Sequence, residues 1–393
     1  MSLARNLCLY KHIGAPLLFG RGAFDELGRL LSEQSCRHVL ILHGRSVEKS
    51  GVLSRLTQAL TDLKIRFLCQ SGIPSDPTDA AVEKAAEIAR EEQVDCVVGI
   101  GGGSVLDSAK VVNLLLTNPM PIHQYFAPCS LKLQPLKPMY LVPTTAGTGS
   151  EVTSFSVITD TRKGRRKASI SFKELAPTFA VVDPELTLSM PASLTAATGM
   201  DAFAHACDAL TCNCTNPISD VLAERAIRLI HDNLVNAVQD GGNISARENM
   251  AFAAVLGGLA FSNASTQLSH AIAQALGGEF HIAHGRACAV VMPAVLRWVG
   301  KVNPVGAGKI LSAMGISVSS KADVGDTLAE AVTSLNQKIG MPGLGDLLPE
   351  DVSLLSLLPK IRAQRPFNAI PAEISDAELL AVLQEAISKN PSI

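Results

Sequence analysis

Short apolar runs alternate with helical runs through the first half of the chain, and this alternation limits the possible folds strongly. Four β-rich runs are expected to form buried strands, at residues 37–44, 65–72, 95–103 and 138–145. Between them, residues 50–63 and 78–92 carry apolar side chains at helical spacing. An order of strand, helix and strand predicts a parallel, doubly wound sheet with helices on its faces.

The pattern changes after residues 180–191. From Ala192 onward the chain is expected to be helical, for example over residues 219–240 and 376–388. A chain of 393 residues is too long for one ordinary core. We therefore predict an α/β domain over residues 1–188 and an all-helical domain over residues 189–393.

Composition narrows the class of protein. Hydrophobic residues make up 47% of the chain and charged residues 18%, and the formal net charge is −2. This balance is typical of a well-buried enzyme and does not favour nucleic acid or an anionic membrane as a partner. The nine cysteines are dispersed, as in proteins that keep their thiols reduced. No signal-like segment or run of eighteen apolar residues is present in the sequence, so we expect a cytoplasmic protein.

A glycine-rich turn follows the third predicted strand. Residues 94–110 read as a strand, the turn Gly101–Ser104 and a helix. Glycines let the backbone approach a ligand closely, and a helix N-terminus attracts a pyrophosphate. A simple tight turn explains this segment equally well, because it does not match the usual GxGxxG fingerprint. A second polar loop, residues 143–153, follows the next strand, and two such loops at adjacent strand ends predict a site for an extended dinucleotide.

Several residues in the second half are candidates for metal binding. Asp201 and His205 are four residues apart, which places them on one face of a helix. His270, His281 and His284 follow in a small, apolar segment, where histidines serve as metal ligands, acid–base groups or hydrogen-bonded core residues. Asp201 and His205 by themselves are also compatible with a surface salt bridge. However, their neighbours are small or apolar, and a buried aspartate requires a partner such as a metal ion.

Four segments together resemble a known family. "GGGSVLDSAK" (101–110), "PTTAGTGSEVT" (143–153), "MDAFAHACDA" (200–209) and "SHAIAQALGG…HIAHGRA" (269–287) resemble, in order and spacing, the group III, or iron-containing, alcohol dehydrogenases. The resemblance covers nearly the whole chain. It implies a dinucleotide-binding α/β domain followed by a helical metal and substrate domain.

The resemblance also implies a ligand set. When the family's ligands are carried over residue by residue, a divalent ion would be held by Asp201, His205, His270 and His284. The family usually uses Fe²⁺, with Zn²⁺ as an alternative. His281 is not a ligand in this pattern, although it remains a candidate for substrate contact or proton relay. Many members carry a histidine where this chain has Gln274, and glutamine does not titrate near neutral pH. A proton relay would then run through His281, the cofactor ribose or water.

Cofactor contacts follow from the same resemblance. The residues implied are Gly101, Gly102, Gly103 and Ser104 at the pyrophosphate, Thr144, Thr145 and Thr148 along the adenine, ribose and phosphate path, the acid Asp107, and Lys167 near the nicotinamide ribose. Enzymes that prefer NAD often carry an acid at the end of the second strand to bind the ribose hydroxyl. Here that position reads Gly44, Arg45 and Ser46, which predicts a preference for NADP over NAD. Alternatively, Arg45 is simply a solvated loop charge.

The implied activity is that of a metal-dependent, NAD(P)-linked alcohol dehydrogenase or aldehyde reductase. The divalent ion would polarise the oxygen of a small alcohol or aldehyde, and the nicotinamide would carry the hydride. His281, Gln274 and Lys167 are the candidate catalytic residues outside the ligand set. We expect a homodimer or higher homo-oligomer. The alternatives are a dehydroquinate synthase-like lyase and a catalytically silent metal- or nucleotide-binding protein.

Overall fold

A parallel sheet forms the centre of the first half of the chain in this computed structural model, which describes residues 14–162, 166–317 and 324–388. Its strands are β1 (Leu17–Phe19), β2 (His38–His43), β3 (Arg66–Gln70), β4 (Cys96–Gly101), β5 (Met139–Pro143) and β8 (Phe179–Val182). They lie in the order β1-β8-β5-β4-β2-β3, and every pair is parallel. The predicted doubly wound sheet is therefore confirmed.

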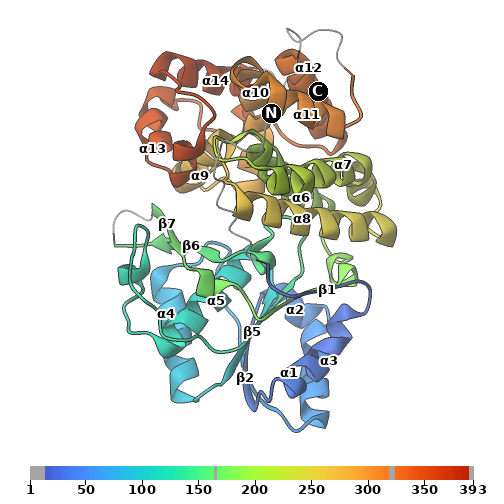
Figure 1. Cartoon of the computed structure of the whole chain (residues 1–393), viewed down its shortest axis with the longest axis vertical. Coiled ribbons are helices and arrows are strands. Elements are labelled where there is room, and N and C mark those ends of the chain that lie inside the picture. Colours follow the sequence, from blue (N-terminus) through green and yellow to red (C-terminus); the bar gives the residue numbers. More distant parts are fainter. Residues whose placement is uncertain (1–13, 163–165, 318–323, 389–393) are drawn as a thin grey trace. The chain divides into compact units, whose positions relative to one another are not determined.

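Helices cover both faces of this sheet (Figure 1). One face packs against α1 (Leu27–Glu33), α2 (Arg45–Lys49) and α3 (Val52–Asp62), and the other against α4 (Asp79–Glu91) and α5 (Gly103–Thr117). Successive residues of β2 enter opposite cores: Val39 and Ile41 enter one, and Leu40 and Leu42 the other. Because both faces are covered, β2, β4 and β5 are apolar without interruption, as the sequence showed.

Two strands lie outside the large sheet. β6 (Phe155–Asp160) and β7 (Arg166–Ser171) pair antiparallel to each other. Neither was predicted, and nor were the short strands β1, at one edge of the large sheet, and β8, between β1 and β5, because none of them carries a long apolar run. Short 3-10 segments complete this half: η1 (Ala23–Glu26), η2 (Ile122–Tyr125), η3 (Ser150–Val152), η4 (Lys173–Leu175) and η5 (Pro184–Thr187).

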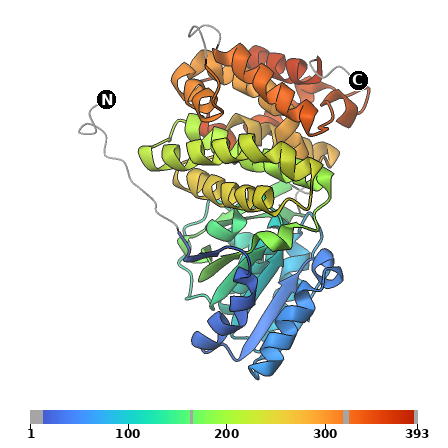
Figure 2. The same ribbon diagram turned by 90° about the vertical axis from the view of Figure 1, so that its right-hand side faces the viewer.

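The rest of the described chain is helical, and Figure 2 shows no arrow among its yellow to red segments. Its helices are α6 (Ala192–Thr211), α7 (Pro217–Gln239), α8 (Ile244–Asn263), α9 (Leu268–Phe280), α10 (His284–Val302), α11 (Pro304–Ala313), α12 (Val324–Lys338), α13 (Leu358–Arg362) and α14 (Asp376–Ser388), with short 3-10 segments η7 (Gly345–Leu347), η8 (Leu354–Leu357) and η9 (Arg365–Ala369). The predicted helical second half is confirmed. Among the described residues, no helix is both long and apolar enough to span a membrane.

Small residues let these helices approach one another closely. A Cβ atom added to Gly300 of α10 would lie 2.2 Å from the Cα atom of Gly325 on α12. The two backbones therefore touch, and a larger side chain at Gly300 would push the helices apart.

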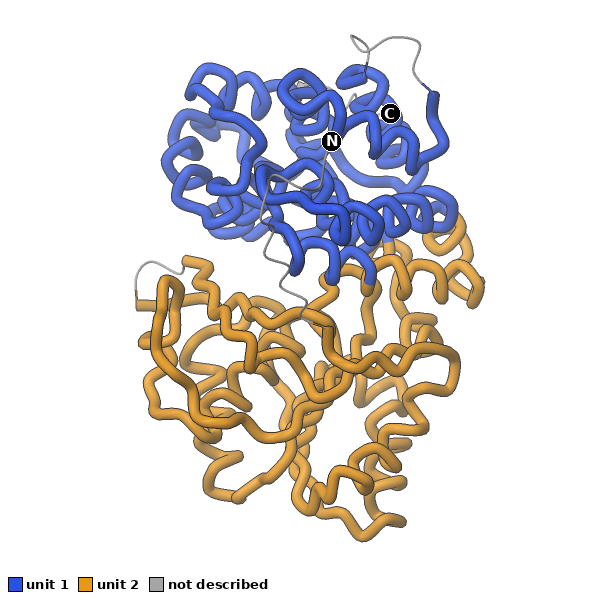
Figure 3. Tube along the Cα trace, in the orientation of Figure 1, with its two compact units in different colours: residues 1–13, 196–235, 256–393 blue, residues 14–195, 236–255 orange. Residues whose placement is uncertain are grey.

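The chain divides into two compact units (Figure 3). Of the described residues, unit 1 contains 196–235, 256–317 and 324–388, and unit 2 contains 14–162, 166–195 and 236–255. Helices α6, α7 and α8 thus contribute residues to both units. The domain junction between residues 188 and 189 stays a prediction.

Candidate metal centre and nucleotide-binding loops

Three helices of unit 1 bring four potential metal ligands together. Asp201 on α6, His270 on α9, and His284 and Cys288 on α10 place one donor atom each within 4.8 Å of the others. The Asp201 Oδ1 atom lies 3.5 Å from His284 Nε2 and 3.9 Å from His270 Nε2. Asp201 and His270 are buried, whereas 43% of the His284 side chain is exposed. The group is thus buried at Asp201 and His270 and accessible to solvent at His284.

His205 lies beside this group. It follows Asp201 by one helical turn, and its ring stacks between those of Phe261 and His270, with centroid distances of 4.3 and 4.5 Å. Of the four predicted ligands, three therefore belong to the compact cluster and the fourth stacks against it. Cys288 was not predicted from the sequence. It follows His284 by four residues, and this spacing places both side chains on one face of a helix, which could have identified it.

The His270 ring is oriented by a buried carboxylate. His270 Nδ1 lies 2.7 Å from Asp208 Oδ2, which also accepts hydrogen bonds from the Gln267 backbone N–H and the Ser269 hydroxyl, both at 2.8 Å. A proton on Nδ1 leaves the lone pair of Nε2 free, and that buried atom has no hydrogen-bond partner within the described chain. Asp208 was missed by sequence reasoning, although it lies three residues after His205 in the same segment.

The charge state of these side chains suits a cation. Burial lowers the pKa of His205 to about 3, so its imidazole is neutral, and His205 Nδ1 is buried without a partner among the described residues. Burial by itself would raise the pKa of Asp201, but the His205, His284 and His270 rings together lower it. Neutral imidazoles and one carboxylate are the donors that Fe²⁺ or Zn²⁺ binds. The residues present therefore fit a divalent metal ion.

The two candidate relay residues lie close to this cluster in sequence. Gln274 is half-buried on α9, one turn after His270. His281 is exposed and ends α9 in a left-handed conformation, with φ of 57°, and its N–H donates to the Gly277 carbonyl at 3.1 Å. His281 thus has a structural role as a helix cap, independent of any catalytic one.

The glycine-rich turn of unit 2 lies where the strand order reverses. The chain passes from β2 to β3 on one side and then to β4 and β5 on the other, so the loops after β2 and β4 are neighbours. Ligands of open α/β sheets bind at such a reversal, at the carboxyl ends of the strands. Three predicted groups lie at these strand ends: Gly44, Arg45 and Ser46 after β2, Gly101 as the last residue of β4 with Gly102, Gly103 and Ser104 after it, and Thr144, Thr145 and Thr148 after β5.

Close contacts hold these loops together. A Cβ atom on Gly103 would lie 2.6 Å from the Thr148 methyl carbon, so the two loops pack directly on each other. The Thr144 N–H donates to the Gly101 carbonyl at 2.9 Å. The Ser104 hydroxyl donates to the Ser75 carbonyl at 2.5 Å. Arg45 and Ser46 are exposed.

Two other predicted cofactor residues are engaged within the protein. The Asp107 carboxylate accepts hydrogen bonds from the Ser150 hydroxyl at 2.6 Å and the Val157 N–H at 2.8 Å. Lys167, on β7, pairs with Asp76 and contacts the Thr159 hydroxyl at 3.3 Å. Both side chains therefore have structural contacts besides any contact with a cofactor.

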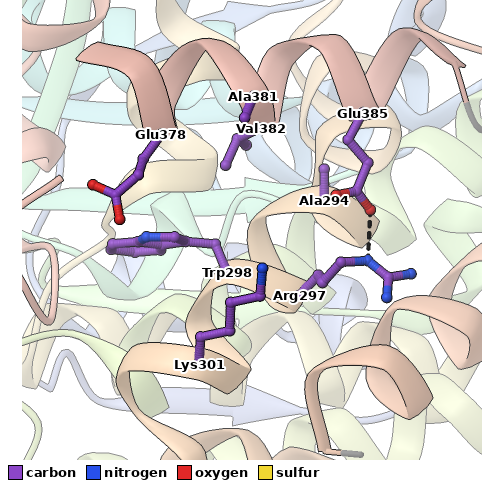
Figure 4. A pocket seen from close by; sticks show the side chains of 8 residues that line it. All are labelled: Ala294, Arg297, Trp298, Lys301, Glu378, Ala381, Val382 and Glu385. Atoms are coloured by element: carbon purple, nitrogen blue, oxygen red, sulfur yellow. Dashed lines mark hydrogen bonds and ion pairs between the residues drawn. The ribbon is translucent and has the colours of Figure 1, made fainter. Parts of the chain in front are cut away.

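A further concavity lies between α10 and α14 (Figure 4). Its volume is about 120 Å³, and it is lined by Ala294, Arg297, Trp298, Lys301, Glu378, Ala381, Val382 and Glu385. Arg297 Nε donates to Glu385 Oε1 at 2.6 Å across it. The helical rise places Ala294 ~15 Å along α10 from His284, so this cavity is separate from the metal-ligand cluster.

Comparison with known proteins gives the same result for both halves of the chain. The family model for iron-containing alcohol dehydrogenases matches residues 15–184, and the model for the C-terminal part of that family matches residues 195–386. The chain is 36% identical to 1,3-propanediol dehydrogenase of Klebsiella pneumoniae over 328 residues, covering 82% of this chain and 84% of the relative. It is 33% identical to NAD-dependent methanol dehydrogenase of Bacillus methanolicus over 344 residues, covering 86% and 90%.

A solved structure agrees at the level of the fold. The crystal structure of a 1,3-propanediol oxidoreductase matches with a TM-score of 0.92 and 33% identity, covering 96% of this chain and 100% of that one. Both family models, the relatives and the fold thus lead to one assignment: the chain belongs to the iron-containing alcohol dehydrogenase family and is an oxidoreductase.

Proposed function

We propose that this protein interconverts small alcohols and aldehydes with NADP(H), using Fe²⁺ held by Asp201, His205, His270 and His284. The observation that carries the proposal is the cluster around Asp201, where the buried His270 Nε2 atom lies 3.9 Å from the carboxylate and lacks a hydrogen-bond partner among the described residues. A buried acceptor of this kind is costly unless a cation or donor occupies the space beside it.

Each unit would supply one part of the reaction. When bound, the ion supplies Lewis-acid polarisation of the substrate oxygen, and the nicotinamide carries the hydride. Asp201 and the three imidazoles would hold the ion, while Asp208 keeps His270 in the tautomer that leaves Nε2 available. The loops after β2, β4 and β5 would bind the dinucleotide, with the N-terminus of α5 facing its phosphates.

The preference for NADP rests on the end of β2. Gly44 supplies no carboxylate to bind a ribose hydroxyl, and Arg45 and Ser46 are exposed beside it. Arg45 makes no ion pair within the described residues, so its guanidinium is available for a phosphate. The methanol dehydrogenase relative is NAD-dependent by name.

The proton relay is proposed to run through His281. His281 lies in the turn between α9 and α10, and these helices carry His270 and His284. Gln274, one turn beyond His270, cannot titrate and would contribute hydrogen bonds only.

We also propose that Lys167 contacts the nicotinamide ribose. The dispersed thiols support a cytoplasmic location for the protein. We further propose that the protein is a homo-oligomer, which size-exclusion chromatography would test.

Metal analysis tests the ligand set. The purified enzyme is loaded anaerobically with Fe²⁺, and bound iron and turnover are compared in variants with alanine at Asp201, His205, His270, His284 or Cys288. The four proposed ligands should each lose most of the iron together with activity, whereas Cys288→Ala should keep both. Full iron occupancy in His205→Ala, with loss in Cys288→Ala, would replace His205 by the thiol in the ligand set.

A charge substitution tests the cofactor preference. A Cβ atom on Gly44 would lie 3.7 Å from Val105 and 3.8 Å from Ser46, so an aspartate fits there. Gly44→Asp should repel the 2′-phosphate and shift the ratio of kcat/KM from NADPH toward NADH by at least tenfold, about 1.4 kcal/mol. Equal efficiency with the two cofactors in the parent enzyme would refute the preference.

A pH–rate comparison tests the relay. Gln274→His should keep the metal and add a titrating group to the profile of kcat. His281→Asn, which tolerates the left-handed backbone, should slow aldehyde reduction with little change in the KM for NADPH. If both variants keep the parent profile, water or the ribose hydroxyl carries the proton instead.

A further inference from the structure

Two cysteines lie in contact directly after α6. Cys212 Sγ and Cys214 Sγ are 3.6 Å apart, with Cys212 buried and Cys214 exposed. The backbone holds them in place, because the Cys212 N–H donates to the Asp208 carbonyl at 2.9 Å and the Asn213 N–H to the Ala369 carbonyl at 3.0 Å. The Asn213 side chain adds a hydrogen bond to the Asn368 carbonyl at 3.1 Å. The contact between the two thiols is therefore built into the turn.

The two thiols differ in their chemistry. The hydrogen bond from Cys212 lowers the pKa of Cys214 to about 7, whereas the same hydrogen bond and burial raise the pKa of Cys212. Cys69 is also exposed, but burial of its thiol and the nearby Glu48 raise its pKa. Because the thiolate is the nucleophile, Cys214 has both the access and the ionisation that reactive cysteines require, and Cys69 has the access alone.

We propose that Cys214 and Cys212 form a peroxide-reactive thiol pair, in which Cys214 is the attacking thiolate and Cys212 resolves it to an intramolecular disulfide. In the first step Cys214 Sγ attacks hydrogen peroxide, an S–O bond forms, the O–O bond breaks and hydroxide leaves. In the second step Cys212 Sγ attacks Cys214 Sγ, the S–S bond forms and the S–O bond breaks. The Cys212 proton and the hydroxyl group leave as water.

The two steps together transfer two electrons from the thiols to hydrogen peroxide. Two thiols are oxidised to one disulfide, and one hydrogen peroxide is reduced to two water molecules. The sulfur atoms must close from 3.6 Å to a bond of about 2.05 Å. Cys212 must also give up its 3.6 Å contact with the Ala209 carbonyl. A dithiol reductant reverses the modification by thiol–disulfide exchange.

Mass spectrometry of the full chain tests the pair. The enzyme is loaded with Zn²⁺, which has no redox reaction with peroxide, and is treated with a small molar excess of hydrogen peroxide, unfolded, alkylated and digested. The peptide that contains Cys212 and Cys214 should lose two hydrogens and carry no alkyl group on either cysteine, and dithiothreitol should restore both labelling sites. In untreated enzyme at pH 7, native alkylation by iodoacetamide should be at least tenfold faster at Cys214 than at Cys69.

Three variants separate the roles. Cys214→Ser should abolish the disulfide; this residue is exposed, so the fold should be kept. Cys212→Ser should leave a Cys214 sulfenic acid that dimedone captures, and Cys69→Ser should behave as the parent. If Cys214 and Cys69 react at equal rates, if Cys212 and Cys214 stay thiols under peroxide, or if Cys214 forms only intermolecular disulfides, the proposal is wrong.

Discussion

Asp208 is the residue on which the orientation of His270 depends. Its side chain is fully buried and accepts three hydrogen bonds, from His270 Nδ1, the Gln267 N–H and the Ser269 hydroxyl. A carboxylate behind a ligating imidazole fixes the tautomer and raises the basicity of the nitrogen that faces the metal. One buried acid outside the predicted ligand set thus contributes to the site.

Asp208→Asn should weaken iron binding by about 10- to 100-fold while leaving the fold intact, because the amide keeps the shape and loses the charge. Ser269→Ala is a comparison variant that keeps the Asp208 contact with His270: it removes a hydroxyl that donates to the same carboxylate and also lies 3.2 Å from His270 Nδ1. Chelator competition measures the affinity of both. Parent affinity in Asp208→Asn would show that the carboxylate has no part in holding the metal.

The helix α5 and the loop after β5 are joined by a buried charged cluster. Lys110 Nζ donates to the Ser150 hydroxyl at 2.9 Å, the Thr153 hydroxyl at 3.0 Å and the Phe155 carbonyl at 2.8 Å. Burial lowers the pKa of Lys110 to about 8 and raises the pKa of the neighbouring Glu151 to about 7. The contribution of this cluster to the stability of the fold therefore depends on pH.

Glu151 should make the enzyme less stable as the pH rises from 4.5 toward 7. The folded state holds the Glu151 proton up to a pKa of about 7, whereas the unfolded chain releases it near 4.5, and the difference corresponds to about 3 kcal/mol. The stabilisation is complete below 4.5 and is lost as the pH passes through 7. Glu151→Gln should remove this slope in denaturant unfolding, and the exposed Glu92→Gln should keep it. An unchanged slope in Glu151→Gln would assign the pH dependence to other groups.

At the scale of the whole molecule, the two predicted ligand sites belong to different units. Every proposed metal ligand lies in unit 1, and every proposed dinucleotide loop lies in unit 2. Binding to the native state stabilises the segments that contact the ligand, and hydrogen exchange reports such local stability.

Iron should slow amide exchange in α6, α9 and α10 of the enzyme, and NADPH should slow it around residues 44–46, 101–104 and 144–148. The measurement is hydrogen–deuterium exchange with each ligand alone and with neither. Protection by iron in the unit 2 loops, with none in α9 or α10, would contradict the assignment of the metal to unit 1.

The sequence by itself determined most of the elements and the family. The strands β2 to β5 and the helices α3, α4 and α14 begin and end within two residues of the predicted ranges. These elements could be predicted because burial on one or both sides gives their apolar residues a regular spacing in the local sequence. The four family segments also predicted His270 and His284, whose Nε2 atoms lie 3.9 and 3.5 Å from Asp201 Oδ1. Short strands such as β6 and β7 carry no such period, so their pairing was not predicted.

Only the tertiary structure decided which side chains meet. Asp208 and His270 are 62 positions apart, and Cys288 and Asp201 are 87 apart, yet both pairs are in contact because α6, α9 and α10 bring these positions together. Lys167 pairs with Asp76, 91 positions away, for the same reason. Local sequence sets the period of an element, but the partner of a buried polar atom depends on which helix or strand packs against it, and no local pattern records that.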